Sequence, residues 1–134
     1  MDCAEDGLEA IELFRKAHAS ADAYTAVILD LVVRAGMGAH FGLRLVEGAD
    51  DTILSELDIP LFGTSSHAAQ RLDEFALPWP CAWVFGHEGQ GVAEGVARHC
   101  RAMLAIPQPG GGESLNVAAA AAVCLYETAR QHGR

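Results

Sequence analysis

Two apolar runs that each end in a glycine-rich loop constrain the fold of this chain more than any other feature. The run Ala-Trp-Val-Phe at 82–85 stops at Gly-His-Glu-Gly-Gln-Gly, and the run Ala-Met-Leu-Ala-Ile at 102–106 stops at Pro-Gln-Pro-Gly-Gly-Gly. Short, continuously apolar runs with such boundaries are typical of strands buried on both faces of a parallel sheet. Ligands of open α/β sheets bind at the carboxyl ends of the strands. The sequence therefore predicts a binding site formed by these two loops.

The rest of the chain alternates between helical and strand patterns, which predicts an α/β fold with a parallel sheet sandwiched by helices. With 134 residues, the chain is expected to form a single domain. Ser65 or Ser66 is a candidate cap for one of the helices, and Ser114 for the long alanine-rich one. Helices are expected at 6–18, 50–57, 66–75 and from 114 onward, and strands at 24–33, 59–64, 82–85 and 102–106.

Composition limits the cellular setting. Apolar residues make up 51% of the chain, yet no run approaches the roughly 20 apolar residues of a membrane span. The acidic start lacks the basic and apolar regions of a signal peptide. The four cysteines are scattered without a Cys-x-x-Cys pair, which favours reduced thiols over disulfides or a zinc site. We therefore expect a cytoplasmic protein with no membrane or metal partner.

The charge balance bears on nucleic-acid binding. The formal net charge is −9, and Lys16 is the only lysine. Proteins whose affinity depends on a broad phosphate-binding surface carry a basic patch instead. A broad RNA-binding surface is therefore not expected in this chain.

Three motifs carry a family resemblance through their order and spacing. Gly-x-Glu-x-x-Gly at 86–91 follows an apolar strand, Ile-Pro at 106–107 precedes a glycine-rich loop, and Glu-Ser-Leu-Asn-Val-Ala occupies 113–118. Together they resemble the second and third motifs of the SpoU/TrmH group of SPOUT RNA 2′-O-ribose methyltransferases. The resemblance covers about residues 34–134. It implies S-adenosylmethionine as cofactor, tRNA or rRNA as substrate, and a trefoil knot in the C-terminal part.

The resemblance also assigns candidate site residues. Gly86 is expected to let the backbone approach the cofactor, because a side chain there would obstruct it. Glu88 is expected to orient the substrate or an active-site arginine, with a solvated loop acid as the alternative. Ser114 and Asn116 match a polar pair of the family, although either can also serve the first turn of the last helix. The cofactor pocket is expected to include Thr64, Gly86, Ile106 and Leu115, and the catalytic group Glu88, Ser114 and Asn116.

One part of the family pattern is missing. SpoU enzymes carry a first motif with an asparagine and, a few residues on, an arginine that activates the ribose hydroxyl. Nothing before Val33 matches that motif. Arg34 echoes an Arg-x-Ala segment and is the candidate catalytic replacement. We therefore predict a SpoU-like domain by ancestry whose turnover is impaired or absent.

The N-terminal segment invites a different interpretation. Residues 4–33 resemble the second helix and third strand of response-regulator receiver domains, and Asp30 falls on the phosphoacceptor of that family. The acidic residues that would bind Mg²⁺ are missing, so a strand-end acid is the simpler interpretation of Asp30. The pattern predicts a chimera of a receiver-like part (1–33) and a SpoU-like part (34–134), either laboratory-made or a natural degenerate paralogue. A non-catalytic chimeric or engineered dimeric scaffold with a partial cofactor pocket is the alternative function.

The last helix predicts an assembly. Its residues are apolar on nearly all sides before Glu127, with one face at Leu115, Ala118, Ala119, Ala122, Tyr126 and Ala129 and an opposite face at Val117, Ala120, Ala121, Cys124 and Leu125. An all-round apolar helix must be covered on more than one side. The sheet can cover one side only. Since SPOUT domains pair through this helix, we expect a homodimer.

Overall fold

The chain forms a parallel sheet between two layers of helices. A computed structural model describes residues 52–87, 90–110 and 114–133. The strands are β1 (Leu61–Thr64), β2 (Gln70–Arg71), β3 (Ala82–Val84) and β4 (Ala102–Ala105), in the order β2-β4-β1-β3. All three pairings are parallel. The predicted α/β fold with a parallel sheet is therefore confirmed.

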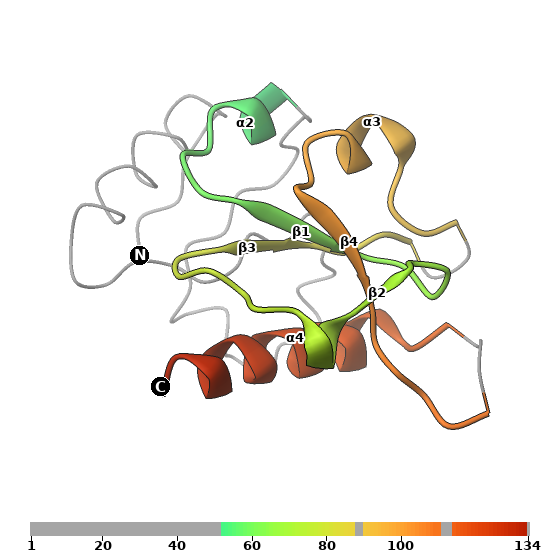
Figure 1. The fold of residues 1–134 in the computed structure, drawn as a ribbon. Coiled ribbons are helices and arrows are strands. Elements are labelled where there is room, and N and C mark those ends of the chain that lie inside the picture. Colours follow the sequence, from blue (N-terminus) through green and yellow to red (C-terminus); the bar gives the residue numbers. More distant parts are fainter. Residues whose placement is uncertain (1–51, 88–89, 111–113, 134) are drawn as a thin grey trace, which may run out of the picture.

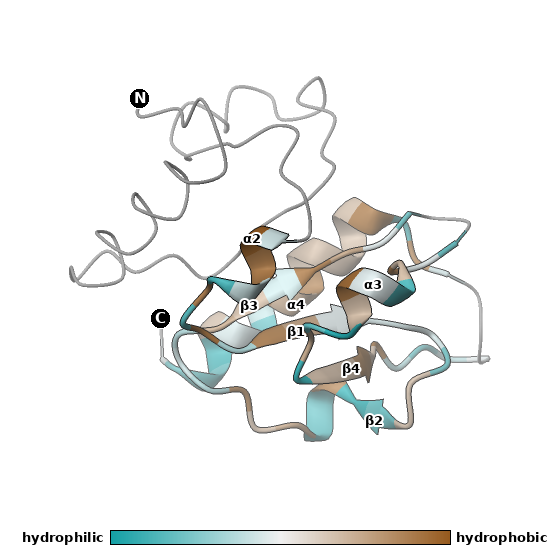
Figure 2. Ribbon diagram, turned by 90° about the horizontal axis from the view of Figure 1, so that it is seen from above, coloured by the Kyte–Doolittle hydropathy of each residue, from teal (hydrophilic) through white to brown (hydrophobic). Residues whose placement is uncertain are grey.

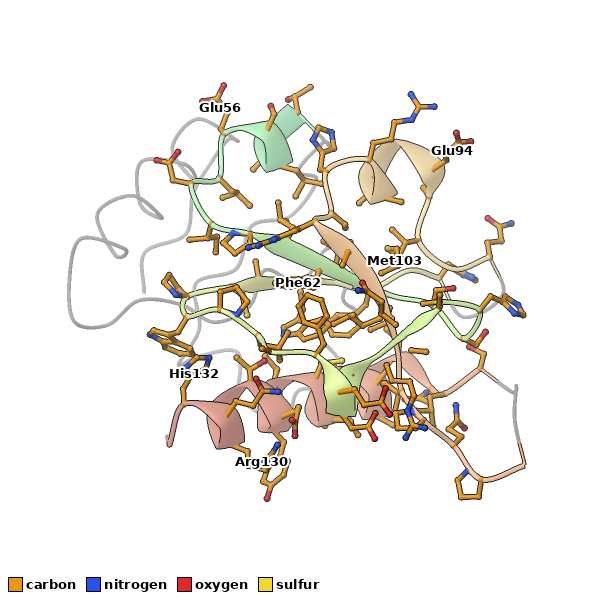
Figure 3. The ribbon with its side chains drawn as sticks, in the orientation of Figure 1. Glu56, Phe62, Glu94, Met103, Arg130 and His132 are labelled. Carbon is orange, nitrogen blue, oxygen red and sulfur yellow. The ribbon has the colours of Figure 1, made fainter. Side chains whose placement is uncertain are left out.

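The helices divide between the two faces of the sheet. Figure 1 shows α2 (Thr52–Ser55) and α3 (Glu94–Ala97) on one side and α4 (Val117–Gln131) on the other. Leu61, Ala82 and Val84 pack with Leu54 of α2. Figure 3 shows Phe62 on the opposite side, between the sheet and α4. The alternation of side chains along each strand thus buries both faces, which explains the uninterrupted apolar runs in the sequence.

The segment after β1 differs from the prediction. A helix was expected at 66–75, but the chain makes a turn, the two-residue strand β2 and a 3₁₀ turn, η3 (Leu72–Glu74). Ser65 Oγ accepts a hydrogen bond from the amide of His67, and β2 pairs with the edge of β4. Figure 2 shows β2 in hydrophilic colour, and both of its residues are exposed. The segment pairs with the free edge of β4 instead of forming a helix. The helical spacing of Leu72 and Phe75 does not require a helix here, because the 3₁₀ turn also points both side chains inward.

The cap of helix α4 lies two residues later than expected. Asn116, rather than Ser114, is its cap: Asn116 Oδ1 accepts hydrogen bonds from the amides of Ala118 at 3.0 Å and Ala119 at 3.3 Å. Ala120, Cys124 and Thr128 are buried against the sheet. The other apolar face remains exposed, with Val123 at 40% and Tyr126 at 70% of full exposure.

A buried polar contact joins α4 to the sheet. The indole N–H of Trp83 donates to Thr128 Oγ1 at 3.0 Å, and the Thr128 hydroxyl donates to the carbonyl of Cys124 at 2.8 Å. Trp83 and Thr128 are both fully buried. Burial raises the pKa of the neighbouring thiols of Cys81 and Cys124, that of Cys124 to about 12. Both cysteines therefore stay neutral. The pair fixes which face of α4 meets the sheet.

Several sequence expectations lie outside the described residues. They are the helix at 6–18, the strand at 24–33, Cys3 and Asp30. In the part of the chain that the structure describes, no helix has the length and hydrophobicity to cross a bilayer.

Replacing Thr128 with valine tests the buried contact. Valine keeps the shape but removes the acceptor, so a buried indole N–H is left unpaired. We expect Thr128→Val to lower the free energy of unfolding by about 1–3 kcal/mol, measured by urea denaturation. Thr128→Ser is the control, because it keeps the hydroxyl and should leave the indole N–H resonance of Trp83 unchanged. A valine variant as stable as the wild type would contradict this role.

Candidate functional site

A cavity of about 450 Å³ opens where three strands end and α4 begins. Thr64 ends β1, Phe85 follows β3, and Ile106 follows β4. Leu115, which precedes the helix cap, and Val117, the first residue of α4, also line the cavity. Parallel strands place their carboxyl ends at one edge of a sheet, so residues far apart in sequence meet here. The volume lies within the range of about 300–1,000 Å³ that is usual for small-molecule sites.

Apolar and hydrogen-bonding side chains both line the cavity. The apolar ones, together called the apolar wall, include Phe85, Ile106, Leu115, Val117 and Ala120. Hydroxyl, imidazole and amide groups come from Ser65, Ser66, His67, His87, Gln90, Gln108 and Ser114. The described lining contains no aspartate, glutamate, lysine or arginine. The described side chains can therefore recognise a ligand by hydrogen bonds and apolar contact.

The loop after β3 is closed by its own backbone. The amide of His87 donates to Gly91 O at 3.1 Å, and the amide of Gly91 donates back to His87 O at 2.8 Å. A Cβ on Gly86 would lie 1.9 Å from the carbonyl carbon of Gly91. Glycine at 86 is therefore required by the loop itself, in addition to the predicted approach of the backbone to a ligand. The tight turn holds His87 at the cavity.

The structure brings five of the predicted site residues to one place. Thr64, Gly86, Ile106, Leu115 and Ser114 all line the cavity. Asn116 is not among the lining residues, because its side-chain oxygen caps α4. Glu88 and Arg34 lie outside the described residues. The roles of all eight remain predictions.

Other lining residues were not singled out from the sequence. His67 and His87 line the cavity, as do Ser65, Gln90 and Gln108. Each follows the end of a strand or sits in a loop between a strand and a helix. The rule that ligands meet the carboxyl ends of parallel strands applied to these positions too. Within the described ranges, no three His, Cys, Asp or Glu side chains are grouped so as to hold a metal ion.

Comparison with known proteins places the chain in a family. The SpoU rRNA Methylase family profile matches residues 7–126, so the chain belongs to this family. It is 40% identical over 81 residues to the 23S rRNA (guanosine-2′-O-)-methyltransferase RlmB of Nitrosomonas europaea, covering 60% of this chain and 31% of that protein. The RlmB of Bordetella pertussis is 41% identical over 78 residues, covering 58% and 32%. The chain thus spans only about a third of the length of these relatives.

Solved structures share the fold. The crystal structure of an RNA 2′-O ribose methyltransferase superposes with a TM-score of 0.71 at 28% identity, covering 98% of this chain and 54% of that one. The SpoU methyltransferase AviRb from Streptomyces viridochromogenes, in complex with AdoMet, gives a TM-score of 0.70 at 25% identity, covering 91% and 52%.

The extent of the family match corrects the interpretation of the N-terminal part. We interpreted residues 4–33 as receiver-like and the SpoU-like part as beginning near residue 34. The family match begins at residue 7, so nearly all of that segment, including Asp30, belongs to the SpoU match. A chimera with a receiver domain is therefore not supported. The helix-strand alternation common to both α/β families accounts for the misleading similarity.

Alanine substitutions at Gly86 and Gly110 distinguish the steric overlap of an added Cβ from the cost of a left-handed backbone conformation. Gly86→Ala would place a Cβ against the backbone of Gly91 and Val92, whereas Gly110 has a φ of 84° and open space around its Cβ position. We expect Gly110→Ala to cost about 1 kcal/mol, from the left-handed backbone alone. Gly86→Ala should cost more, at least about 2 kcal/mol, because the loop must shift. Urea denaturation of both variants measures this, and equal costs would contradict the overlap.

Proposed function

We propose that this chain is the cofactor-binding domain of an S-adenosylmethionine-dependent RNA 2′-O-ribose methyltransferase. The observation that carries the proposal is the cavity in which Thr64, Gly86, Ile106 and Leu115 come together at the strand ends. Family membership supports it, as does the related SpoU methyltransferase AviRb in complex with AdoMet. The relatives named for 23S rRNA favour an rRNA substrate, and tRNA is the alternative. A cytoplasmic location belongs to the same proposal.

The lining residues fit such a cofactor. The apolar wall formed by Ile106, Leu115 and Val117 suits the flat face of adenine. The hydroxyl of Thr64 and the amides of Gln90 and Gln108 suit the ribose and methionine ends, where hydrogen bonds fix orientation. When bound, the cofactor supplies a methyl group on a cationic sulfur.

Methyl transfer also needs a residue that takes or orients the proton of the ribose hydroxyl. Ser114 lies at the cavity and can donate a hydrogen bond to the substrate. We assign Glu88 to orienting the substrate and Arg34 to replacing the arginine of the missing first motif. Asn116 stabilises α4, which positions Leu115 and Ser114 beside the cavity. Turnover is impaired in this proposal, because Arg34 lacks the asparagine that accompanies the arginine in the family pattern.

A non-catalytic, dimeric cofactor-binding scaffold is the second candidate. The cap role of Asn116 favours it, because one of the proposed catalytic side chains already uses its oxygen within α4. The two candidates share the cavity and differ only in turnover. An assay of methyl transfer to rRNA separates them once cofactor binding is established.

The exposed face of α4 supports a homodimer. Val123 and Tyr126 are exposed large apolar side chains, and Ala118, Ala119 and Ala122 beside them are also exposed. Small residues allow the backbones of two helices to approach closely, and twofold symmetry would bring the same face of both copies together. We also propose that the C-terminal segments, from about 59 to 130, form the trefoil knot of the family.

Calorimetric titration with S-adenosylmethionine and S-adenosylhomocysteine tests the cavity. We expect micromolar binding of both, and its loss in Leu115→Asp, because a carboxylate would be buried in the apolar wall. Ser55→Asp is the matched control, since it adds the same charge at an exposed position of α2. Retained binding in Leu115→Asp, or no binding by the wild type, would sink the proposal.

Sedimentation equilibrium tests the dimer. Val123→Asp combined with Tyr126→Glu puts two charges on each copy of the exposed face, so we expect the assembly to become monomeric. Ser55→Asp should remain dimeric, because Ser55 lies in α2 on the opposite side of the sheet. A monomeric wild type, or a dimer that survives both substitutions, would rule out this interface.

A further inference from the structure

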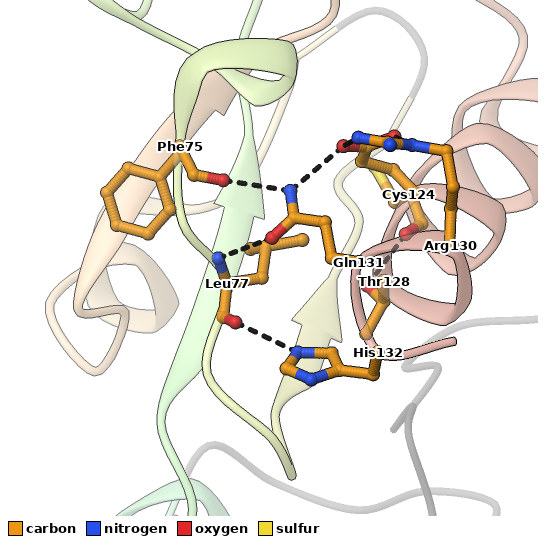
Figure 4. Close-up of polar contacts among 8 residues, drawn as sticks. Phe75, Leu77, Cys124, Thr128, Arg130, Gln131 and His132 are labelled. Carbon is orange, nitrogen blue, oxygen red and sulfur yellow. Dashed lines mark hydrogen bonds and ion pairs between the residues drawn. The ribbon is translucent and has the colours of Figure 1, made fainter. Parts of the chain in front are cut away.

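The C-terminal end of α4 is clamped to the segment that leads into β3. Gln131 Nε2 donates to the carbonyl of Phe75 at 3.0 Å, and its Oε1 accepts from the amide of Leu77 at 2.9 Å. One side-chain amide thus pairs with two backbone groups, as a neighbouring strand would (Figure 4). His132 Nε2 lies 2.9 Å from the carbonyl of Leu77 and completes the contact. Its ring also lies 5.5 Å from that of Trp79.

The clamp is held in place from the helix side. Glu127 Oε1 accepts from Gln131 Nε2 at 2.9 Å, and the carboxylate also accepts two hydrogen bonds from Arg130, at 2.7 and 2.8 Å. Hydrogen bonds from Arg130 and Gln131 lower the pKa of Glu127 to about 2. Glu127 therefore remains an acceptor throughout the neutral range, and the Gln131 amide is fixed in one orientation.

The far end of α4 is tied to the chain by hydrogen bonds as well as by packing. The helix is 15 residues long, and its first six are Val-Ala-Ala-Ala-Ala-Ala. Alanine side chains form shallow ridges, so packing alone specifies axial position weakly. Thr128 bonds to Trp83, Gln131 bonds to the backbone of Phe75 and Leu77, and His132 lies within hydrogen-bond distance of the Leu77 carbonyl. These contacts fix the axial position of α4 at the end that lies away from the cavity.

Residues from both elements that the clamp joins line the cavity. Leu115, Val117 and Ala120 lie at the N-terminal end of α4, and Phe85, Gly86, His87 and Gln90 follow β3. Displacing a helix by one residue moves it about 1.5 Å along its axis and turns its side chains by about 100°. A shift of that size would carry Val117 and Ala120 off the apolar wall.

We propose that Gln131 is a positioning residue for the cavity, acting through α4 and without touching the ligand. The effect of Gln131 on ligand binding rests on the proposed cofactor function, whereas its effect on the position of α4 does not. The family match ends at residue 126, so Gln131, its supporting Glu127 and His132 all lie beyond it. The contribution of this segment to the site is thus separate from the family motifs.

Gln131→Met tests the proposal, because methionine matches glutamine in length and lacks both hydrogen-bonding groups. We expect the Kd for S-adenosylmethionine, measured by calorimetry well below the unfolding temperature, to rise about fivefold. Amide hydrogen exchange should accelerate at 117–120 as well as near residue 131. Ile59→Val is the control, since Ile59 packs in the cluster on the other face of the sheet. It should lower stability without changing either readout.

The two readouts keep the outcomes separable. If exchange in Gln131→Met changes only near residue 131 and the Kd stays at the wild-type value, the clamp is merely a local contact and the proposal is wrong. If Ile59→Val weakens binding to the same degree, the effect follows general stability, which also overturns it. If the wild type binds no cofactor, the proposed function fails. Exchange at 117–120 in Gln131→Met then still decides whether the clamp sets the helix.

Discussion

The packing of α4 against one face of the sheet is the constraint on which the rest of the structure depends. Trp83 makes two of the contacts in this packing. Its ring contacts that of Phe62, with centroids 5.8 Å apart, and its indole N–H donates a hydrogen bond to Thr128. Fully buried Leu104 and Cys124 fill the space around them. A polar pair inside an apolar layer selects one helix orientation, because any other would leave the indole N–H unpaired. The cavity exists because the helix so oriented begins beside the carboxyl ends of the strands.

The cavity and the family match both support the proposal that this domain binds S-adenosylmethionine. The cavity combines an apolar wall with hydroxyl and amide groups, and its described lining carries no carboxylate, ammonium or guanidinium. The family match covers residues 7–126, although the chain spans about a third of the RlmB relatives. Binding and turnover are separate properties of such a site. In the proposal, binding depends on the strand ends and α4, and turnover depends on Glu88 and Arg34, which lie outside the described residues.

The sequence allowed the sheet and much of the cavity to be predicted. Buried parallel strands produce uninterrupted apolar runs, so 82–85 and 102–106 were recognisable, and their loops indicated the site. The 66–75 segment was not predictable, because pairing with the edge of β4 is a tertiary contact that local spacing does not encode. The clash that requires glycine at 86 was not predictable either, because it too is a contact between backbone segments. The clamp at Gln131 could not be predicted because its partners are more than 50 residues away. Ser114 was predicted as the cap of α4, whereas the structure shows Asn116 accepting hydrogen bonds from the first-turn amides.

The most direct test of the central claim is a crystal structure of the protein with S-adenosylhomocysteine. The account predicts that the ligand lies between the ends of β1, β3 and β4 and the first turn of α4. Its adenine should contact Ile106 and Leu115, and its ribose or amino-acid end should meet Thr64 and the neighbouring amides. A ligand bound elsewhere on the chain, or a cavity that remains empty at saturating ligand, would contradict it.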